Sequence, residues 1–356
     1  MSPNAKTDHA GADCHFSRSK LCLIYFTISL TLVFLTGSCG DSFAASKSSR
    51  QQVVAKKTAK KPHVKVKKKS SIKPSRTKYI KPVSPGVQAK AAYCVNLANN
   101  QTLISKNADQ KLPIASLTKM VTALLTLDHM PLDREITIPD HIKTVPKSVV
   151  GLKPGDTLTV KDLLHGMLIS SGNDCAEALA CAFPGGKTKF IQALNQKAKS
   201  IGAVHTQFFT PSGLDKKLGS ATKDDKEPES EANVSTAREI ATIARIAFSN
   251  LTIRTICQKK SYVLASKLNP KGYAIRNTNK LLRDNLPVVG GKTGFTCRAG
   301  HCLASEFTPG KNVFVIVVLG SPNHFRDTRL LYHKAIKETS ASKSVSVDSS
   351  PKVASK

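Results

Sequence analysis

The sequence predicts an α/β (α+β) fold, in which helices pack on a sheet, and three observations support this prediction. The order of the patterns along the chain is strand, helices, strands, helix. Apolar residues recur with a helical period first and with a period of two later. Residues 313–319 (VFVIVVL) are apolar throughout, which is typical of a strand covered on both faces.

The first elements are a strand and a group of helices. Alternating residues predict a strand at 91–97, and the apolar pattern after Pro113 predicts a long helix at 116–129. Residues 161–171 and 174–183 are expected to be two helices, because Gly172 interrupts the apolar pattern between them.

Two amphipathic helices follow at 190–201 and 235–248. Ser235 or Thr236 is suited to cap the second of them, with Glu239 in its first turn. The remaining expected elements are four strands and a closing helix, at 261–265, 288–296, 301–306, 313–319 and 324–338.

The net charge of +30 is concentrated in one segment. The charges of residues 1–46 sum to zero, whereas residues 47–81 contain fourteen Lys and Arg and no acidic residue. Such a segment repels itself and has no apolar periodicity, so residues 47–84 are expected to be an extended, Lys-rich disordered linker. The 40% hydrophobic content of the whole chain still allows a substantial core and excludes wholesale disorder.

The N-terminal segment, 1–46, is predicted to be an export signal or a membrane anchor. A fifteen-residue apolar run at 21–35 follows Arg18 and Lys20, and is short for a membrane-spanning helix of about 20 residues. Small residues allow cleavage after Ala44, and lipid attachment at Cys39 is an alternative. We therefore expect an exported, periplasmic or cell-envelope protein, with cleavage or retention of the segment left open.

Residues 339–356 form a Ser/Lys/Val low-complexity tail, so the folded domain is expected at 85–338. Inside it, the stretch from 215 to 233 is the only acid-rich patch of the chain. Its simplest interpretation is a solvated surface loop.

A serine and a lysine three residues apart carry the first chemical signal. The spacing Ser-x-x-Lys occurs seven times, but only Ser116 opens an apolar helix, where Lys119 lies within reach on the same face. A serine hydroxyl becomes a good nucleophile when a base removes its proton. A lysine acts as that base when burial or a nearby positive charge lowers its pKa.

Two further motifs make this pair more specific. Ser171-Gly172-Asn173 lies at the junction of two expected helices, where short polar side chains can project into a cleft. Lys292-Thr293-Gly294 lies on an expected strand, where Gly294 allows a ligand to approach the backbone and Lys292 supplies the second positive charge.

With these three motifs in this order, the chain resembles the low-molecular-weight penicillin-binding proteins that act as serine-type D-alanyl-D-alanine carboxypeptidases. The resemblance covers about residues 86–338 and includes PIASLTKMVTALL, GLKPGDTLTVKDLLHGMLISSGNDCAEALA, FFTPSGLD and VVGGKTGFTCRAGHCLA. It implies the serine β-lactamase/DD-peptidase-like fold, with an antiparallel sheet, helices on both faces and a helical subdomain.

The resemblance also implies catalytic roles. Ser116 would be the acylated nucleophile and Lys119 its general base. Ser171, assisted by Lys292, would relay a proton to the leaving D-alanine, and Asn173 would hold the substrate amide.

The Lys-Thr-Gly strand would bind the substrate. The backbone N–H of Ser116 and that of Phe295, after Gly294, would form the oxyanion hole. Thr293 and Thr296 are candidates for the terminal carboxylate of the peptide. No cofactor is expected and no metal is needed, because the histidines show no ligand spacing.

Two features depart from the family pattern. Many relatives carry a second, all-β domain and a C-terminal anchor, where this chain has only its short tail. Cys175 stands where a small residue such as Ala is common, so a small structural role is expected for it and a redox or disulfide role is the alternative. Pairing of Cys297 with Cys302 and the state of Cys181 stay open.

Three other functions are alternatives to this one. A class A β-lactamase needs Glu-Pro-x-x-Asn, and this chain has Glu231 where the Asn should follow Glu227-Pro228. A transpeptidase or endopeptidase of the same family uses the same residues and stays open as an alternative. A non-catalytic envelope-binding protein is disfavoured by the intact Ser116 and both lysines.

The expected partners follow from this reading. They are a peptidoglycan stem peptide that ends in D-alanyl-D-alanine and β-lactam inhibitors. Residues 47–81 are expected to act as a charged spacer that contacts anionic membrane lipid or wall polymer. No nucleic-acid partner is expected, because the segment is exported and the chain has few aromatic residues and no Trp.

Overall fold

A computed structural model describes residues 86–217 and 230–347. The expected export segment 1–46 and linker 47–84 lie outside the described residues, as do 218–229 of the acid-rich patch. The described residues all belong to one compact unit.

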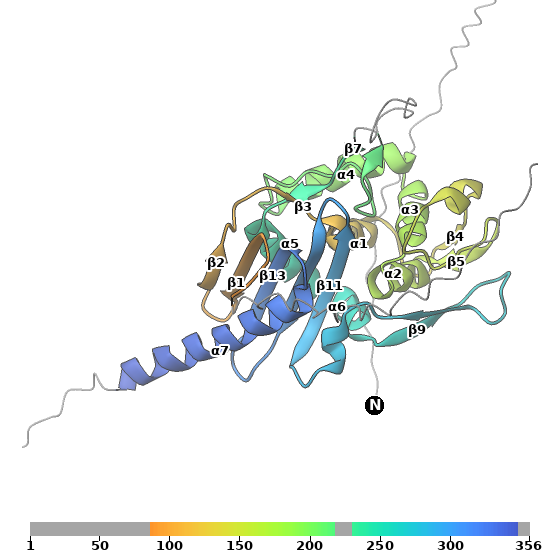
Figure 1. The fold of residues 1–356 in the computed structure, drawn as a ribbon. Coiled ribbons are helices and arrows are strands. Elements are labelled where there is room, and N and C mark those ends of the chain that lie inside the picture. The colour runs from red at the N-terminus through yellow and green to blue at the C-terminus, as the bar shows by residue number, and fades with distance from the viewer. Residues whose placement is uncertain (1–85, 218–229, 348–356) are drawn as a thin grey trace, which may run out of the picture. The chain divides into compact units, whose positions relative to one another are not determined.

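Five antiparallel strands form the central sheet, in the order β11-β12-β13-β1-β2 (Figure 1). These strands are β1 (Ala91–Asn96), β2 (Gln101–Lys106), β11 (Val288–Thr296), β12 (Gly300–Phe307) and β13 (Phe314–Ser321). Strands from both ends of the domain therefore pair in the middle of the sheet. The predicted antiparallel sheet is confirmed.

Both faces of the sheet are covered. Successive residues of a strand point to opposite faces, and on β1 Ala91 and Ala92 accordingly belong to two different core clusters. One cluster packs against α5 (Ala237–Ser249) and the other against α7 (His324–Val347). The apolar run in β13 is fully explained by this double coverage.

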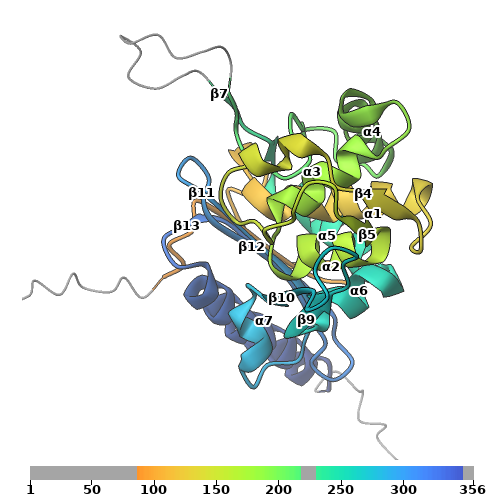
Figure 2. The same ribbon diagram turned by 90° about the vertical axis from the view of Figure 1, so that its right-hand side faces the viewer.

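The helical subdomain packs on the side of the sheet opposite to α7 (Figure 2). It contains α1 (Lys119–His129), α2 (Val160–Ile169), α3 (Asn173–Cys181) and α4 (Gly186–Ser200), which contact one another. The Gly172 break separates α2 from α3 as predicted.

Several elements were not predicted. β2 has a mostly exposed, polar sequence without apolar alternation, and α6 (Leu251–Gln258) is only eight residues long. β9 (Ser261–Leu264) was expected, but it pairs with the unpredicted β10 (Tyr273–Arg276) in a separate two-stranded sheet. Short segments of this kind lack enough residues for a clear period.

Several short elements connect the larger ones. Three two-stranded pairs join β3 (Leu112–Pro113) to β8 (Val234–Ser235), β4 (Glu135–Thr137) to β5 (Thr157–Thr159), and β6 (Lys216–Lys217) to β7 (Ser230–Glu231). Three 3₁₀ turns are η1 (Ala115–Thr118), η2 (Asp140–Thr144) and η3 (Lys280–Arg283).

Some helix boundaries differ from the expected ones. The helix expected from Ser116 starts as η1, and its α-helical part begins only at Lys119. Thr236 caps α5 by accepting a hydrogen bond from the backbone N–H of Glu239 at 3.1 Å. α7 continues past 338 to Val347, and residues 339–347 contain no Gly or Pro that would end the helix earlier.

Among the described residues, no single helix is long and apolar enough to cross a membrane. α5 and α6 meet that criterion only as a pair, across a bend of 95°.

Gly213 allows the loop that contains Ser212 to pack closely against η1. Its φ is +85°, and an added Cβ would lie 1.9 Å from the carbonyl oxygen of Ala115 and 2.9 Å from Oγ1 of Thr118. Only glycine has both the freedom to adopt this backbone conformation and the small size that the contact requires.

Gly213→Ala is therefore expected to destabilise the protein more than Gly202→Ala. Gly202 has a similar φ of +84°, but no atom lies within 4 Å of its would-be Cβ. Both changes introduce the same backbone strain, and Gly213→Ala adds a steric clash that costs about 1–3 kcal/mol more. Urea unfolding of the two variants measures the difference, and equal unfolding free energies would show that the loop moves away at no cost.

Candidate active site

Ser116 lies in η1 at the edge of the sheet, next to β11. It is half-buried, and the preceding Ala115 has an unusual φ of +47°. A Cβ on Gly294 of β11 would lie 3.0 Å from the backbone N of Ser116 and 3.2 Å from Cβ of Ala115. The glycine therefore lets the strand pass close to the backbone amide of Ser116.

Lys119 points at Ser116 from the first position of α1. Its Nζ lies 2.8 Å from Oγ of Ser116, 2.7 Å from Oδ1 of Asn173 and 2.7 Å from the carbonyl oxygen of Ser212. The side chain is fully buried. Burial lowers the pKa of Lys119 well below its usual range, and the nearby positive charge of Lys292 lowers it further. A neutral amine at this position can take the proton of Ser116.

Lys292 and Ser171 form a second pair. Nζ of Lys292 donates hydrogen bonds to Oγ of Ser171 at 2.9 Å and to the carbonyl oxygen of Thr293 at 2.8 Å. Burial lowers the pKa of Lys292 to about 7. Ser171 has a left-handed φ of +64°, which is uncommon outside glycine and marks the sharp turn between α2 and α3.

Asn173 uses both ends of its side-chain amide inside the protein. Its Oδ1 accepts from Lys119, and its Nδ2 donates to the carbonyl oxygens of Pro146 and Lys147 at 3.2 and 2.9 Å. Its backbone N–H donates to the carbonyl of Ser148 at 2.8 Å. In the structure the side-chain amide of Asn173 is therefore bonded to Lys119 and to the loop at Pro146 and Lys147. The family resemblance implied that this amide would instead bind the substrate amide.

The remaining residues of the β11 motif lie farther along the strand. Oγ1 of Thr293 is 2.6 Å from Oγ1 of Thr278, and Oγ1 of Thr296 accepts from the backbone N–H of Ala299 at 3.0 Å. Phe295 is 56% exposed. The structure therefore brings Ser116, Lys119, Ser171, Asn173 and Lys292 into one polar cluster, with Thr293, Gly294, Phe295 and Thr296 along its edge strand.

Sequence reasoning missed the residues that support this cluster. The carbonyl of Ser212 is a direct partner of Lys119, and it belongs to the Thr-Pro-Ser-Gly turn that only the family resemblance had marked. Asn233 donates to Oγ1 of Thr118 at 2.9 Å and accepts from the backbone N–H of Phe209 at 2.7 Å. Asn233 therefore joins the turn that contains Ser212 to η1.

The described cysteines are all unpaired: Cys94, Cys175, Cys181, Cys257, Cys297 and Cys302. Cys175 is fully buried, and burial raises the pKa of its thiol well above the usual range. Its Sγ would lie 2.5 Å from a Cβ on Gly166 of α2, so α2 and α3 pack closely at this point. This packing agrees with the expected small structural role.

A comparison with protein families matches a family described as D-alanyl-D-alanine carboxypeptidase over residues 78–323. A D-alanyl-D-alanine endopeptidase of Escherichia coli is 34% identical over 255 residues, which cover 69% of this chain and 77% of that protein. The carboxypeptidase DacF of Bacillus subtilis is 28% identical over 239 residues, which cover 66% of this chain and 58% of that protein.

The fold is also shared with solved structures. The ampicillin-bound form of penicillin-binding protein D2 from Listeria monocytogenes superposes with a TM-score of 0.59 at 27% identity. The superposition covers 71% of this chain and 99% of that one. The expected serine β-lactamase/DD-peptidase-like fold is confirmed.

The low pKa of Lys292 has a measurable effect on stability, and Lys292→Met tests it. Between pH 7 and 10.5 the unfolded chain holds the lysine proton, with its ordinary pKa of 10.5, whereas the folded protein, with a pKa of about 7, has released it. The unfolding free energy therefore rises with pH in this window, by up to about 1.4 kcal/mol per pH unit for one proton. Below pH 7 the cost of burying the charge is fully present.

Lys292→Met should flatten this rise relative to the unchanged protein, as measured by urea unfolding at several pH values. Lys161→Met is the control, because Lys161 is exposed at the start of α2 and should leave the slope unchanged. An unaltered slope in Lys292→Met would contradict the burial of a neutral lysine.

Proposed function

Since this chain belongs to the D-alanyl-D-alanine carboxypeptidase family and is a serine hydrolase of the penicillin-binding class, we propose that it works through an acyl-enzyme on Ser116. Its substrate is a peptidoglycan stem peptide that ends in D-alanyl-D-alanine, and its product is free D-alanine. One observation carries the proposal: the buried amine of Lys119 lies 2.8 Å from Oγ of Ser116.

The first step is acylation. Neutral Lys119 takes the proton of Ser116 as Oγ attacks the carbonyl carbon of the penultimate D-alanine. The negative charge that develops on the carbonyl oxygen is stabilised by the backbone N–H groups of Ser116 and Phe295. The close passage of β11 at Gly294 supports this role, because it brings the strand next to the amide of Ser116.

The second step releases D-alanine and restores the enzyme. Ser171, hydrogen-bonded to Lys292, relays to the leaving amine the proton that Lys119 took from Ser116, so Lys119 is neutral again. A water molecule then attacks the ester carbonyl of the acyl-enzyme while Lys119 takes its proton. The ester bond breaks, Oγ of Ser116 regains a proton from Lys119, and the peptide leaves with a new carboxyl group. A pKa of about 7 lets Lys292 exchange a proton in either direction near neutral pH.

Other residues position these groups and the substrate. Asn173 is proposed to hold Lys119 in place, with its contacts to the loop of Pro146 and Lys147 fixing the amide. Thr293 and Thr296 are proposed to bind the terminal carboxylate of the peptide. The hydroxyl of Thr296 accepts from the turn at Ala299 and keeps its own hydrogen to donate.

β-Lactams are inhibitors of the family, and one is bound in the Listeria structure. They are expected to acylate Ser116 of this chain in the same way. The similar protein of E. coli is named as a D-alanyl-D-alanine endopeptidase. Endopeptidase or transpeptidase activity at the same serine is therefore the alternative, and it differs only in the acceptor or the bond attacked.

We also propose that the enzyme works outside the cytoplasmic membrane. The apolar run at 21–35 and the basic segment 47–81 support this location. Peptidoglycan is found there, and the basic segment would touch anionic lipid or wall polymer.

Incubation with a penicillin tests the nucleophile. Mass spectrometry should find one covalent adduct, on the peptide that contains Ser116, and Ser116→Ala should form none.

Lys119→Met should slow acylation about 10²–10⁴-fold, because it removes the general base. Ser170→Ala is the matched control: Oγ of Ser170 donates to the carbonyl of Gly166, outside the cluster, so the adduct should form at the normal rate. Labelling of any other serine would refute the assignment.

Product analysis then separates the carboxypeptidase, transpeptidase and endopeptidase activities. With a stem pentapeptide, we expect free D-alanine and the tetrapeptide as the main products, even when an amine acceptor is added. A cross-linked dimer as the main product would instead identify a transpeptidase. Cleavage of a purified cross-linked dimer without release of D-alanine from the pentapeptide would identify an endopeptidase.

A further inference from the structure

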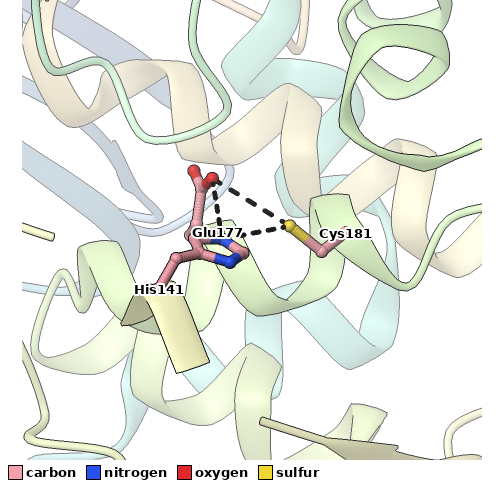
Figure 3. A group of neighbouring side chains, drawn as sticks. All are labelled: His141, Glu177 and Cys181. Carbon is pink, nitrogen blue, oxygen red and sulfur yellow. Dashed lines mark hydrogen bonds and ion pairs between the residues drawn. The ribbon is translucent and has the colours of Figure 1, made fainter. Parts of the chain in front are cut away.

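Three side chains with metal-binding atoms gather where η2 meets the C-terminal half of α3 (Figure 3). Glu177 and Cys181 lie one turn apart on α3, and His141 comes from η2. Nε2 of His141 is 3.5 Å from Oε1 of Glu177 and 3.5 Å from Sγ of Cys181, and Sγ is 4.0 Å from Oε1. None of the three belongs to the proposed catalytic cluster.

These distances are close to those of a tetrahedral zinc site. With Zn–N, Zn–O and Zn–S bonds of about 2.0–2.3 Å, tetrahedral angles place the ligand atoms about 3.3–3.6 Å apart. The three side chains therefore need to close by no more than about 0.5 Å to bind one ion.

The donor set and the burial also favour zinc. Imidazole, thiolate and carboxylate together suit Zn²⁺ or Co²⁺, whereas Mg²⁺ and Ca²⁺ prefer oxygen ligands alone. The Glu177 side chain is only 10% exposed, whereas that of His141 is 51% exposed. The protein thus supplies three ligands from one side, and the solvent side is open for a water molecule as the fourth.

Lys187 is the group with which a metal would compete. Its Nζ lies 2.6 Å from Oε1 of Glu177, and its side chain is 48% exposed. In the absence of an ion this lysine neutralises the mostly buried carboxylate. A long and half-exposed side chain can turn outward when a divalent cation takes its place.

We propose that His141, Glu177 and Cys181 form a zinc site that fastens η2 to α3. Binding forms a Zn–S bond to Cys181 as its thiol proton leaves to solvent, with no change of oxidation state. Zinc replaces the ammonium group of Lys187 as the positive partner of Glu177.

The proposed zinc site lies on the same helix, α3, as Asn173 of the catalytic cluster. Asn173, Glu177 and Cys181 follow one another at intervals of four residues, so they lie along one face of α3. The loop that follows η2 is already attached to this face through the contacts of Asn173 with residues 146–148. A metal ion bound by His141 would attach the segment of η2 and its following loop to α3 at a second point. This point lies farther from Ser116 than the contacts of Asn173.

No motif in the sequence indicates this cluster. His141 lies forty residues before Cys181 and comes from another element, so no short ligand spacing exists. Only the i, i+4 pair of Glu177 and Cys181 is visible in the sequence, and such pairs are common on helices.

Titration of the purified protein with Co²⁺ and Zn²⁺ tests the proposal. Co²⁺ should produce thiolate-to-metal charge-transfer absorption in the near ultraviolet, and one equivalent of Zn²⁺ should abolish it. Cys181→Ser should remove the band, and His141→Ala should weaken metal binding at least about 10-fold. Lys187→Met should strengthen it, because the competing ammonium group is lost.

Two variants serve as matched controls. Cys297→Ser changes an exposed cysteine outside the cluster, and His205→Ala breaks another His–Glu pair, that of His205 with Glu239 at 2.8 Å. Both should bind Co²⁺ like the unchanged protein. Absence of the band in the unchanged protein, its persistence in Cys181→Ser, or unchanged affinity in Lys187→Met would overturn the proposal. Penicillin labelling of Ser116 is read out separately, so failure of the metal site leaves the proposed function untouched.

Discussion

The burial of two lysine side chains, Lys119 and Lys292, is the constraint on which the rest of the domain depends. A buried ammonium group is costly unless hydrogen-bond acceptors surround it, and a second positive charge nearby raises that cost. The protein supplies the acceptors from separate parts of the chain: the carbonyl of Ser212, the amide of Asn173 and the carbonyl of Thr293. Burial and the nearby charge of Lys292 act in the opposite direction: they lower the pKa of Lys119 and keep it able to act as a base.

The architecture can be understood as the means of bringing these acceptors together. The sheet supplies β11 with Lys292, the helical subdomain supplies the turn between α2 and α3, and the loop around Ser212 supplies the last carbonyl. Local features hold these parts in place. Ser171 forms a left-handed turn, Gly213 lets its loop pack closely against η1, and Asn233 hydrogen-bonds to Thr118. The polar cluster is thus a product of tertiary packing, although each of its motifs is short.

The sequence was informative where a pattern is local and long. Period-two segments predicted β11 and β12, a continuous apolar run predicted β13, and the three motifs predicted the members of the polar cluster. It failed for β2, whose polar residues carry no alternation, and for the carbonyl of Ser212, because a backbone group has no signature in the side-chain sequence. The grouping of His141 with Glu177 and Cys181 depends on two elements meeting in space, which no spacing in the chain records.

The partners of Lys119 also determine when the serine becomes reactive. Ser116 is three residues from Lys119, but Asn173 is 54 and Ser212 is 93 residues away, and Lys292 lies 121 residues from its partner Ser171. Contacts over such separations form only when most of the chain has folded. Before that, Lys119 is hydrated and protonated, and Ser116 is an ordinary alcohol. A chain in transit or still emerging from a ribosome therefore carries no activated nucleophile, and reactivity begins with the completed fold.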